Sequence, residues 1–422
     1  MTAAQTDLVA IEGGAPVRTA PFPSVGSAAG RTFGQEEIDA LTRVIKSGML
    51  SRVGGTEVPA LEAEFAEFIG AKHAVASTSG TSAIHLAVAA VDLEPGDEII
   101  VPPITDFGTV VGVLAQNAVP IFADADPLTG AMTPDTVRAA LSERTKAVIV
   151  VHLFGGGADV DGIIAVARER GVMVIEDCAQ AYLAQPPGSG YAGTHGDIGC
   201  FSLQQSKHIT AGDGGLTVTD DDEIARRMRL FSDKGWPRDT GQRVHLSFGV
   251  NYRMTELQGA VARAQLKKLP GVVDARRRNA ARLIEAARDL PGLSTPPSAD
   301  GHSFWLFPLV IDPDVVGVAN KEYAKALVAE GIPISGGYLE RPVYLQPALT
   351  ERRVYGNSGY PFTAPPARQE IVYRRGDCPV AERMIDQTLM VMQWNEKYTD
   401  ADVDDIIAAV RKVHQHFVSR RG

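Results

Sequence analysis

The sequence predicts an α/β protein, in which a large domain with a mainly parallel seven-stranded sheet is followed by a smaller α+β C-terminal domain. Two observations predict this class. Between residue 73 and about residue 220, short apolar runs alternate with helical stretches, which is typical of βαβ units. The chain of 422 residues is also longer than one compact core usually supports. We expect an N-terminal arm over 1–30, the large domain over 31–265 and the small domain over 266–422.

Seven apolar runs supply the predicted strands of the large domain. The segment 147–151, Ala-Val-Ile-Val-Val, suits a sheet covered by helices on both faces. Two helices are expected before the first strand, from about Gln35 to Lys46 and from Val58 to Ile69. The first carries Ile38, Leu41, Val44 and Ile45 on one face. The runs are His73–Ser77, Glu98–Val101, Val119–Ala123, Ala147–His152, Val172–Glu176, Ile198–Leu203 and Gly215–Thr219.

The second half of the chain has a different pattern. A long helix over Met254–Leu269 is expected to lead out of the large domain. Further on, Ser303–Ile311 is expected to form a strand. The last helix is expected to begin at Thr399, where Thr399 and Asp402 match a capping box before an apolar stripe. Helices are also expected over Arg276–Leu290 and Lys321–Glu330.

Composition excludes several classes of function. The formal net charge of -10 disfavours a nucleic-acid partner, because that affinity depends on clustered Lys and Arg. The basic run at residues 276–278 is interpreted as a solvated helix face. No apolar run approaches the roughly 20 residues that cross a bilayer, and no export signal precedes the first helix, so we expect a cytoplasmic protein without a membrane partner. Cys178, Cys200 and Cys378 have no metal-ligand spacing and are expected to be buried thiols.

Candidate functional residues stand where predicted strands end, since ligands of open α/β sheets bind outside the carboxyl ends of the strands. The first group is residues 77–83, Ser-Thr-Ser-Gly-Thr-Ser-Ala, between a strand and a helix. Small hydroxyl residues at a helix start offer N–H groups and hydroxyls to an anion. The alternative is an ordinary N-cap, which uses Ser79 or Thr81 for the helix itself.

The second group is the acidic pair Glu176-Asp177, which closes an apolar strand. A carboxylate there costs desolvation energy unless it meets a cation or strong donors. A protonated pyridine nitrogen is such a cation, and keeping it protonated makes the ring an electron sink. The alternative is an acidic N-cap at a strand–helix junction.

The third group is a single lysine, Lys207, between a strand and a glycine-rich turn. A Schiff base needs an amine that can lose its proton, and burial lowers the pKa of a lysine toward that condition. The alternative is an exposed structural lysine. His208 is expected to be a packing residue or a neighbour of the site, because no carboxylate or cysteine has matching metal-ligand spacing, and no metal site is expected.

The order of these three groups resembles that of fold-type I enzymes dependent on pyridoxal 5'-phosphate (PLP). Residues 206–215, Ser-Lys-His-Ile-Thr-Ala-Gly-Asp-Gly-Gly, and residues 249–258, Gly-Val-Asn-Tyr-Arg-Met-Thr-Glu-Leu-Gln, narrow the resemblance. Together they resemble the DegT/DnrJ/StrS aminotransferases, which act on keto-sugars and ketocyclitols. The resemblance extends from about Gln35 to the C-terminal helix.

The resemblance implies a role for each matching residue. Lys207 would hold PLP covalently and then act as the acid and base, while Asp177 would pair with the pyridine nitrogen. Gln180 would face the phenolic oxygen of the ring, and Ala179 would lie under the ring. The implied phosphate ligands are Gly80, Thr81 and Ser202, with Asn251 reaching the phosphate from the neighbouring subunit of a homodimer.

One position departs from the family pattern. The family usually carries an aromatic residue stacked on the PLP ring about where Asp106 stands, and an aspartate cannot stack. Either Phe107 takes this place, or Asp106 faces the substrate or caps the next helix. The substrate-contact candidates, each with a plain surface loop as the alternative, are Lys234, Trp236, Arg238, Tyr338 and Arg341.

The resemblance implies amino transfer from an amino acid, L-Gln or L-Glu, to a keto-cyclitol or keto-sugar, in aminoglycoside or amino-sugar biosynthesis. The alternatives are a PLP-dependent sugar dehydratase or epimerase-like enzyme and a non-catalytic regulator with the same fold. The dehydratases of this group replace the lysine with histidine, so Lys207 counts against that alternative. A regulator would be expected to have lost Lys207 or Asp177, and this chain keeps both.

Overall fold

A seven-stranded sheet forms the centre of the large domain. The computed structural model describes residues 8–188, 190–363 and 365–420, so residues 1–7 of the predicted arm lie outside the described part. The strand order is β1-β7-β6-β5-β4-β2-β3, and only β7 runs antiparallel to its neighbours. The predicted fold class is confirmed. The strands are β1 His73–Ser77, β2 Glu98–Val101, β3 Val119–Phe122, β4 Thr145–Val151, β5 Met173–Asp177, β6 Ile198–Ser202 and β7 Gly215–Thr219.

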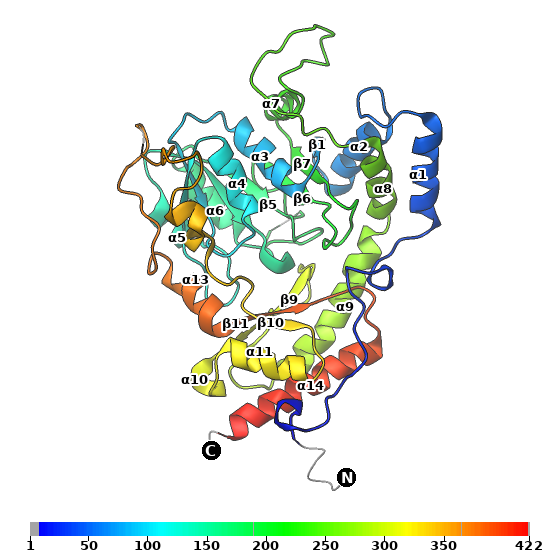
Figure 1. Ribbon diagram of the computed structural model, residues 1–422, viewed down its shortest axis with the longest axis vertical. Helices are drawn as coiled ribbons and strands as arrows, with labels where there is room; N and C mark the ends of the chain where they lie inside the picture. The colour runs from blue at the N-terminus through cyan, green and yellow to red at the C-terminus, as the bar shows by residue number, and fades with distance from the viewer. Residues whose placement is uncertain (1–7, 189, 364, 421–422) are drawn as a thin grey trace.

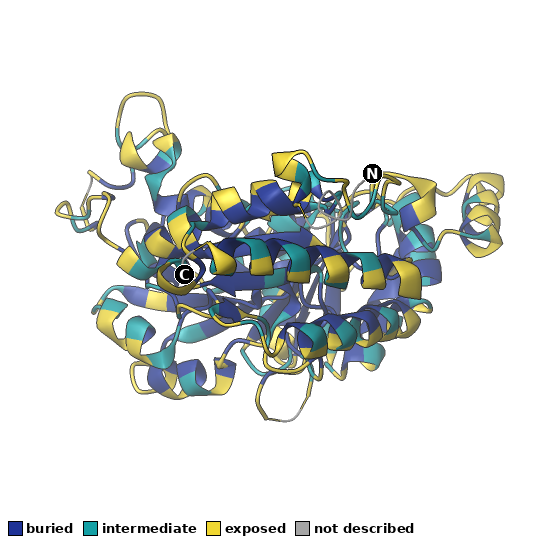
Figure 2. Ribbon diagram, turned by 90° about the horizontal axis from the view of Figure 1, so that it is seen from below, coloured by how far each residue is buried: buried dark blue, intermediate teal, exposed yellow. Residues whose placement is uncertain are grey.

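Helices cover both faces of this sheet, as the apolar central strands require. Figure 2 shows the strands as a buried layer between helices whose outer faces are exposed. Helices α3, α4 and α7 pack on one side, while α5 and α6 pack against the β4–β5 region from the other. The helices of this domain are α1 Gln35–Ser47, α2 Glu57–Ile69, α3 Gly80–Ala90, α4 Gly108–Ala115, α5 Pro134–Ala140, α6 Val160–Arg168, α7 Asp222–Ser232 and α8 Glu256–Leu266.

A four-stranded antiparallel sheet with the order β10-β11-β9-β8 forms the centre of the second domain. It lies below the large sheet in Figure 1, against the long helices α9 and α14. Thr399 and Asp402 form the predicted capping box at the start of α14. The elements are α9 Leu269–Ala287, β8 Leu293–Ser294, β9 Leu306–Ile311, α10 Pro313–Val316, α11 Asn320–Ala329, β10 Ile334–Gly336, α12 Pro347–Thr350, α13 Pro379–Arg383, β11 Leu389–Gln393 and α14 Asp400–Ser419.

The helix predicted over Met254–Leu269 is shorter, because α8 ends at Leu266 and a new helix, α9, begins at Leu269. Pro270 stands in the first turn of α9, where its missing N–H is tolerated and where it cannot continue the preceding helix. The predicted domain boundary at residues 265/266 falls at the end of α8, and the domain ranges stay a prediction. In Figure 1, α9 leads from the large domain toward the small one.

One surface prediction was wrong. The basic run at residues 276–278 is not a solvated face: Arg276 is fully buried, Arg277 donates to the carbonyls of Leu183 and His302, and only Arg278 is exposed. The sequence pattern could not show that the carbonyls of other segments converge on this side of α9. On the predicted apolar face of α1, Val44 is buried, whereas Ile38 and Ile45 are more than half exposed.

Two other predictions have simpler outcomes. The three cysteines are buried, free thiols, as expected. In the part of the chain that the structure describes, no helix is long and apolar enough to cross a membrane.

Candidate active site

The carboxyl ends of the parallel strands β4, β5 and β6 bring the predicted residues together. Asp177 is the last residue of β5, and Ser202 is the last residue of β6. Lys207 follows β6 in a turn, where its N–H donates to the carbonyl of Gln204 at 2.9 Å. Because β5 and β6 are parallel neighbours, the turn after β6 lies beside the end of β5.

Lys207 is half-buried, and its surroundings favour the neutral amine. Burial lowers its pKa to about 8, against the opposing effect of the carboxylates of Asp177 and Asp106. The Nζ atom lies 3.9 Å from the centre of the Trp305 ring. An amine with this pKa loses its proton readily near neutral pH, so it can act as a nucleophile and as a base.

Asp177 is a buried carboxylate that no Lys or Arg of the described residues pairs with. Its Oδ2 accepts from the Thr109 hydroxyl at 2.9 Å, and its Oδ1 accepts from the N–H of Ala179 at 3.0 Å. Burial raises the pKa of Asp177, although these two hydrogen bonds lower it. A cation placed against this carboxyl would offset the desolvation, so the residue fits a protonated ring nitrogen.

The start of α3 fits an anion. As first-turn donors, the N–H groups of Gly80 and Thr81 have no partner within the helix, and no described residue outside it accepts from them. Ser79 accepts from the N–H of Ser82 at 3.0 Å, so it serves as the N-cap and leaves Gly80 and Thr81 free. A Cβ on Gly80 would lie 2.8 Å from the Ser202 hydroxyl, so this hydroxyl stands directly beside the helix start. Both the capping interpretation, at Ser79, and the anion interpretation fit this segment.

Gln180 and Tyr338 form a further side of the site. The Gln180 amide accepts from the N–H of Phe154 at 2.7 Å and donates to the Tyr338 hydroxyl at 3.3 Å. Burial raises the pKa of the Tyr338 hydroxyl, so it stays protonated at physiological pH. Ala179, between Asp177 and Gln180 in the sequence, is half-buried. The structure therefore brings Tyr338 into the site.

Asp106 caps its own turn. Its Oδ1 accepts from the N–H of Gly108, the first residue of α4, at 2.7 Å. Of the interpretations left open for this residue, capping is the one with a direct contact. Phe107 is half-buried and packs against the hydrophobic core of the large domain, and its stacking on the ring stays a prediction.

Several predicted residues lie apart from this cluster. Asn251 is exposed, and its Oδ1 accepts only from the N–H of Arg253 among the described residues. The Arg238 guanidinium stacks on Trp236 with 4.1 Å to the ring centre and donates to Asp233 at 2.8 Å, so both are engaged within their own loop. Lys234 and Arg341 are exposed, without contacts to the site in the described part of the chain.

His152, Glu176 and Cys178 gather ligand atoms within 4.8 Å of one another, but they serve the fold. Glu176 accepts from the N–H groups of Gly193, His195 and Gly196, and it pairs with His152 at 2.8 Å. Burial raises the pKa of Glu176, but these bonds outweigh burial, so the pKa is lowered overall. The carboxylate thus anchors the segment before β6. The two neighbouring acids therefore have different roles: Glu176 binds backbone N–H groups, while Asp177 faces the site.

Sequence reasoning missed four residues of the site's surroundings: Thr109, Trp305, Arg31 and Tyr338's partner Phe154. Thr109 had a local signal only in its place, because it lies at the start of α4, shortly after the carboxyl end of β2. In the structure its hydroxyl lies 2.8 Å from that of Thr105, which precedes the helix. Trp305 and Arg31 had no local signal, since they come from segments about 100 and 176 residues away from Lys207 in the sequence.

The fold and the site together define a class. A two-domain α/β protein with a reactive lysine, a buried acid and an anion-binding helix start at one edge of its sheet has the layout of a PLP-dependent enzyme. The chain matches the model of the DegT/DnrJ/EryC1/StrS aminotransferase family over residues 31–411. It belongs to this family and is an aminotransferase, as the resemblance implied.

The relatives agree with this assignment. An L-glutamine:2-deoxy-scyllo-inosose aminotransferase of Streptoalloteichus tenebrarius is 35% identical over 428 residues, which cover 97% of this chain and 98% of that protein. The crystal structure of an aminotransferase from Psychrobacter cryohalolentis has a TM-score of 0.82 and 30% identity, with coverage of 95% and 100%. An E. coli GDP-4-keto-6-deoxy-D-mannose-3-dehydratase with bound hydrated PLP has a TM-score of 0.77 and 26% identity, with coverage of 93% and 100%. The family's cofactor is PLP, as predicted.

Proposed function

We propose that this enzyme moves an amino group from L-Gln or L-Glu to a keto-cyclitol or keto-sugar, with PLP bound covalently at Lys207. The observation that carries the proposal is the pair of Lys207 and Asp177 at neighbouring strand ends, with a lowered pKa for the amine and a raised pKa for the unpaired carboxyl. These are the two groups that such a cofactor needs at its reactive carbon and at its ring nitrogen. The N–H groups of Gly80 and Thr81 and the hydroxyl of Ser202 would hold the phosphate.

PLP supplies an electron sink for negative charge that develops at the carbon losing a proton. The side chains of the protein would bind the cofactor and move the protons. Lys207 would hold the cofactor covalently, and its Nζ, when free, would take the proton from the donor's α-carbon. Asp177 would keep the ring nitrogen protonated, while Thr109 and the N–H of Ala179 hold the carboxylate in place. Gln180 can donate to the phenolic oxygen.

The acceptor class is supported by the activities for which relatives are named. Besides the scyllo-inosose enzyme, a GDP-perosamine synthase of Caulobacter vibrioides is 35% identical over 327 residues. The Trp305 ring lies against Lys207, and Tyr338 lies edge-on to Trp305 with its hydroxyl bonded to Gln180, a combination that suits a polyol. We therefore place the enzyme in aminoglycoside or amino-sugar biosynthesis. Its location in the cytoplasm stays a prediction.

A homodimer is part of this proposal. Phe248, three residues before Asn251, is 79% exposed, and the loop that carries both projects from the large domain beyond α7 in Figure 1. On α1, Ile38 and Leu41 line an apolar pocket together with Phe33 and Val261. Large exposed apolar side chains of this kind mark protein–protein contacts. A second copy covering them would allow Asn251 to reach the neighbouring site.

Absorbance spectroscopy tests the proposed half-reaction. Adding L-Gln or L-Glu to the purified protein should convert the cofactor to its aminated form and shift its absorbance accordingly. A spectrum that neither donor changes, together with turnover of a keto-sugar alone, would contradict aminotransfer and favour a dehydratase.

A substitution tests the role of Lys207. Lys207→Ala should abolish turnover and leave PLP bound reversibly, because no amine remains to hold it covalently. The matched control is Lys234→Ala, at an exposed lysine that we place outside the cofactor contacts, which should keep its PLP after borohydride reduction. Full activity of Lys207→Ala would refute the assigned role.

A further inference from the structure

Three consecutive residues around Lys207 are each tied to another part of the molecule. The Ser206 carbonyl accepts from the Trp305 indole N–H at 2.8 Å, and the Lys207 carbonyl accepts from the Arg31 guanidinium at 2.7 Å. The His208 Nε2–H donates to the carbonyl of Ser303 at 2.9 Å. The turn that carries the lysine is therefore clamped by the N-terminal arm and by the segment 303–305.

That segment is held rigidly at the domain junction. The Ser303 and Trp305 N–H groups donate to the carbonyls of Gly155 and Phe154 at 2.8 and 2.9 Å. Phe154 and Phe304 both have left-handed backbones, with φ of 59° and 50°. Bulky residues rarely adopt this conformation, so surrounding packing must impose it. Trp305 follows this bend and directly precedes β9, so it reaches Lys207 from the small domain.

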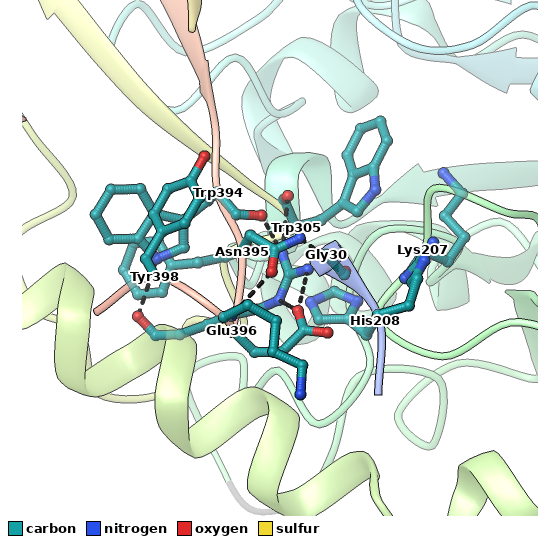
Figure 3. Close-up of polar contacts among 12 residues, drawn as sticks. Gly30, Lys207, His208, Trp305, Trp394, Asn395, Glu396 and Tyr398 are labelled. Atoms are coloured by element: carbon teal, nitrogen blue, oxygen red, sulfur yellow. Dashed lines mark hydrogen bonds and ion pairs between the residues drawn. The ribbon is translucent and has the colours of Figure 1, made fainter. Parts of the chain in front are cut away.

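The Trp305 ring faces the amine as well as the backbone. Lys207 Nζ lies 3.9 Å from the ring centre, within the range of a cation–π contact. Figure 3 shows the indole and the end of the lysine side chain beside each other. The Trp305 side chain thus holds the Ser206 carbonyl through its indole N–H and contacts the Lys207 amine with the face of its ring.

We propose that Trp305 is a positioning residue for Lys207, whose indole face holds the lysine ammonium whenever the amine is not joined to PLP. This inference rests on the proposed function, in which Lys207 alternates between a bound and a free state. Trp305 would keep the freed amine beside the reacting carbons and would favour the protonated form that must return a proton. The small domain would thereby contribute to the acid–base step.

The charges around the amine allow this contribution to be measured. Asp177 and Asp106 favour the charged amine, while burial disfavours it. Burial lowers the pKa of His208 well below its usual value, and burial raises the pKa of Tyr338, so both are uncharged near neutral pH. Arg31 is bound to the Lys207 carbonyl. Weakening only the ring face of Trp305 should therefore lower the pKa of the amine.

Fluorinated tryptophan weakens the ring face with little change in shape. Acylation of Lys207 would be followed by mass spectrometry across pH in the full-length protein after PLP removal. We expect multiply fluorinated tryptophan to lower the midpoint by about half a unit to one unit. The control is the Trp305→Phe variant produced with the same fluorinated tryptophan, which then replaces only the other tryptophans. Its acylation midpoint should equal that of the Trp305→Phe variant produced with ordinary tryptophan. An unchanged midpoint in the wild type, or equal shifts in both proteins, would overturn the proposal.

A second readout follows PLP attachment. Borohydride trapping of the lysine–PLP link should be about 2- to 30-fold slower in Trp305→Leu, whereas Trp305→Phe should retain most of the rate because it keeps an aromatic face. Equal rates in Leu and Phe variants would contradict the role of the face. If added PLP does not protect Lys207 from acylation, the proposed function is overturned. The shift of the acylation midpoint on fluorination tests the role of Trp305 whether or not PLP protects Lys207.

Discussion

At the scale of single residues, Lys207 and Asp177 are both placed where the folded protein disfavours their charged forms. Burial lowers the pKa of the amine and raises that of the carboxyl, and neither group forms an ion pair among the described residues. Such perturbed groups are common in active sites, where reactivity is obtained at a cost in stability. This cost gives a test that does not depend on turnover.

Lys207→Met should raise the free energy of unfolding of the PLP-free protein by about 1–2 kcal/mol at pH 7. The pKa of about 8 in the folded protein lies below the ordinary lysine value of 10.5, so the unfolded chain binds more protons between these pH values. The wild type should therefore gain stability from this group as the pH rises from 8 to about 10, and Lys207→Met should lack this gain. Urea unfolding at pH 7 and pH 10 measures both. A variant less stable than the wild type at pH 7 would contradict the lowered pKa.

At the scale of elements, α9 and the strand end at β11 are joined by a buried ion pair. Arg276 donates to Glu396 at 2.7 Å and to the carbonyls of Phe304, Trp305 and Trp394. In Figure 3, Glu396 and Trp305 lie near His208, the neighbour of Lys207. The pair satisfies carbonyls at the segment that also positions Trp305. It thus supports the active site from the small domain.

Arg276→Ala should lower the free energy of unfolding by about 3–5 kcal/mol, because it leaves Glu396 and several carbonyls buried without partners. Arg278→Ala on the same helix is the matched control, since Arg278 is exposed, and should change it by less than about 0.5 kcal/mol. Chemical unfolding of both variants makes the comparison. Similar decreases in the free energy of unfolding for both variants would mean that the buried contacts of Arg276 do not stabilise the fold.

At the scale of the whole molecule, the described part of one chain holds a Lys207 site whose predicted phosphate ligand Asn251 lies elsewhere on the surface. A homodimer would resolve this separation, because its symmetry gives each site a loop from the other copy. The exposed Phe248 and the apolar face of α1 are the surfaces that such a dimer would bury.

Mixing two inactive variants tests the shared site. Lys207→Ala and Asn251→Ala should each be weakly active or inactive as pure dimers. If subunits exchange after mixing in equal amounts, half of the dimers are hybrids with one intact site, so about a quarter of wild-type activity should return. No recovery, despite hybrids detected by native mass spectrometry, would place Asn251 in the site of its own subunit.

Much of the architecture followed from local patterns. The strands at His73–Ser77, Glu98–Val101 and Gly215–Thr219 begin and end where the apolar runs do, because turn residues and glycines bound them. The break between α8 and α9 was missed although Pro270 signals it, since the apolar stripe on both sides suggested one helix.

By itself, the sequence determined the order of elements, the family and the group of Gly80, Asp177 and Lys207, because strand ends and short motifs are local features of the chain. Only the tertiary structure decided that Arg276 is buried, that Glu176 holds backbone while Asp177 faces the site, and that Trp305 and Arg31 clamp Lys207. These facts depend on segments about 20 to 180 residues apart meeting at the domain junction, and no pattern within a single segment records which distant carbonyl or ring it will meet.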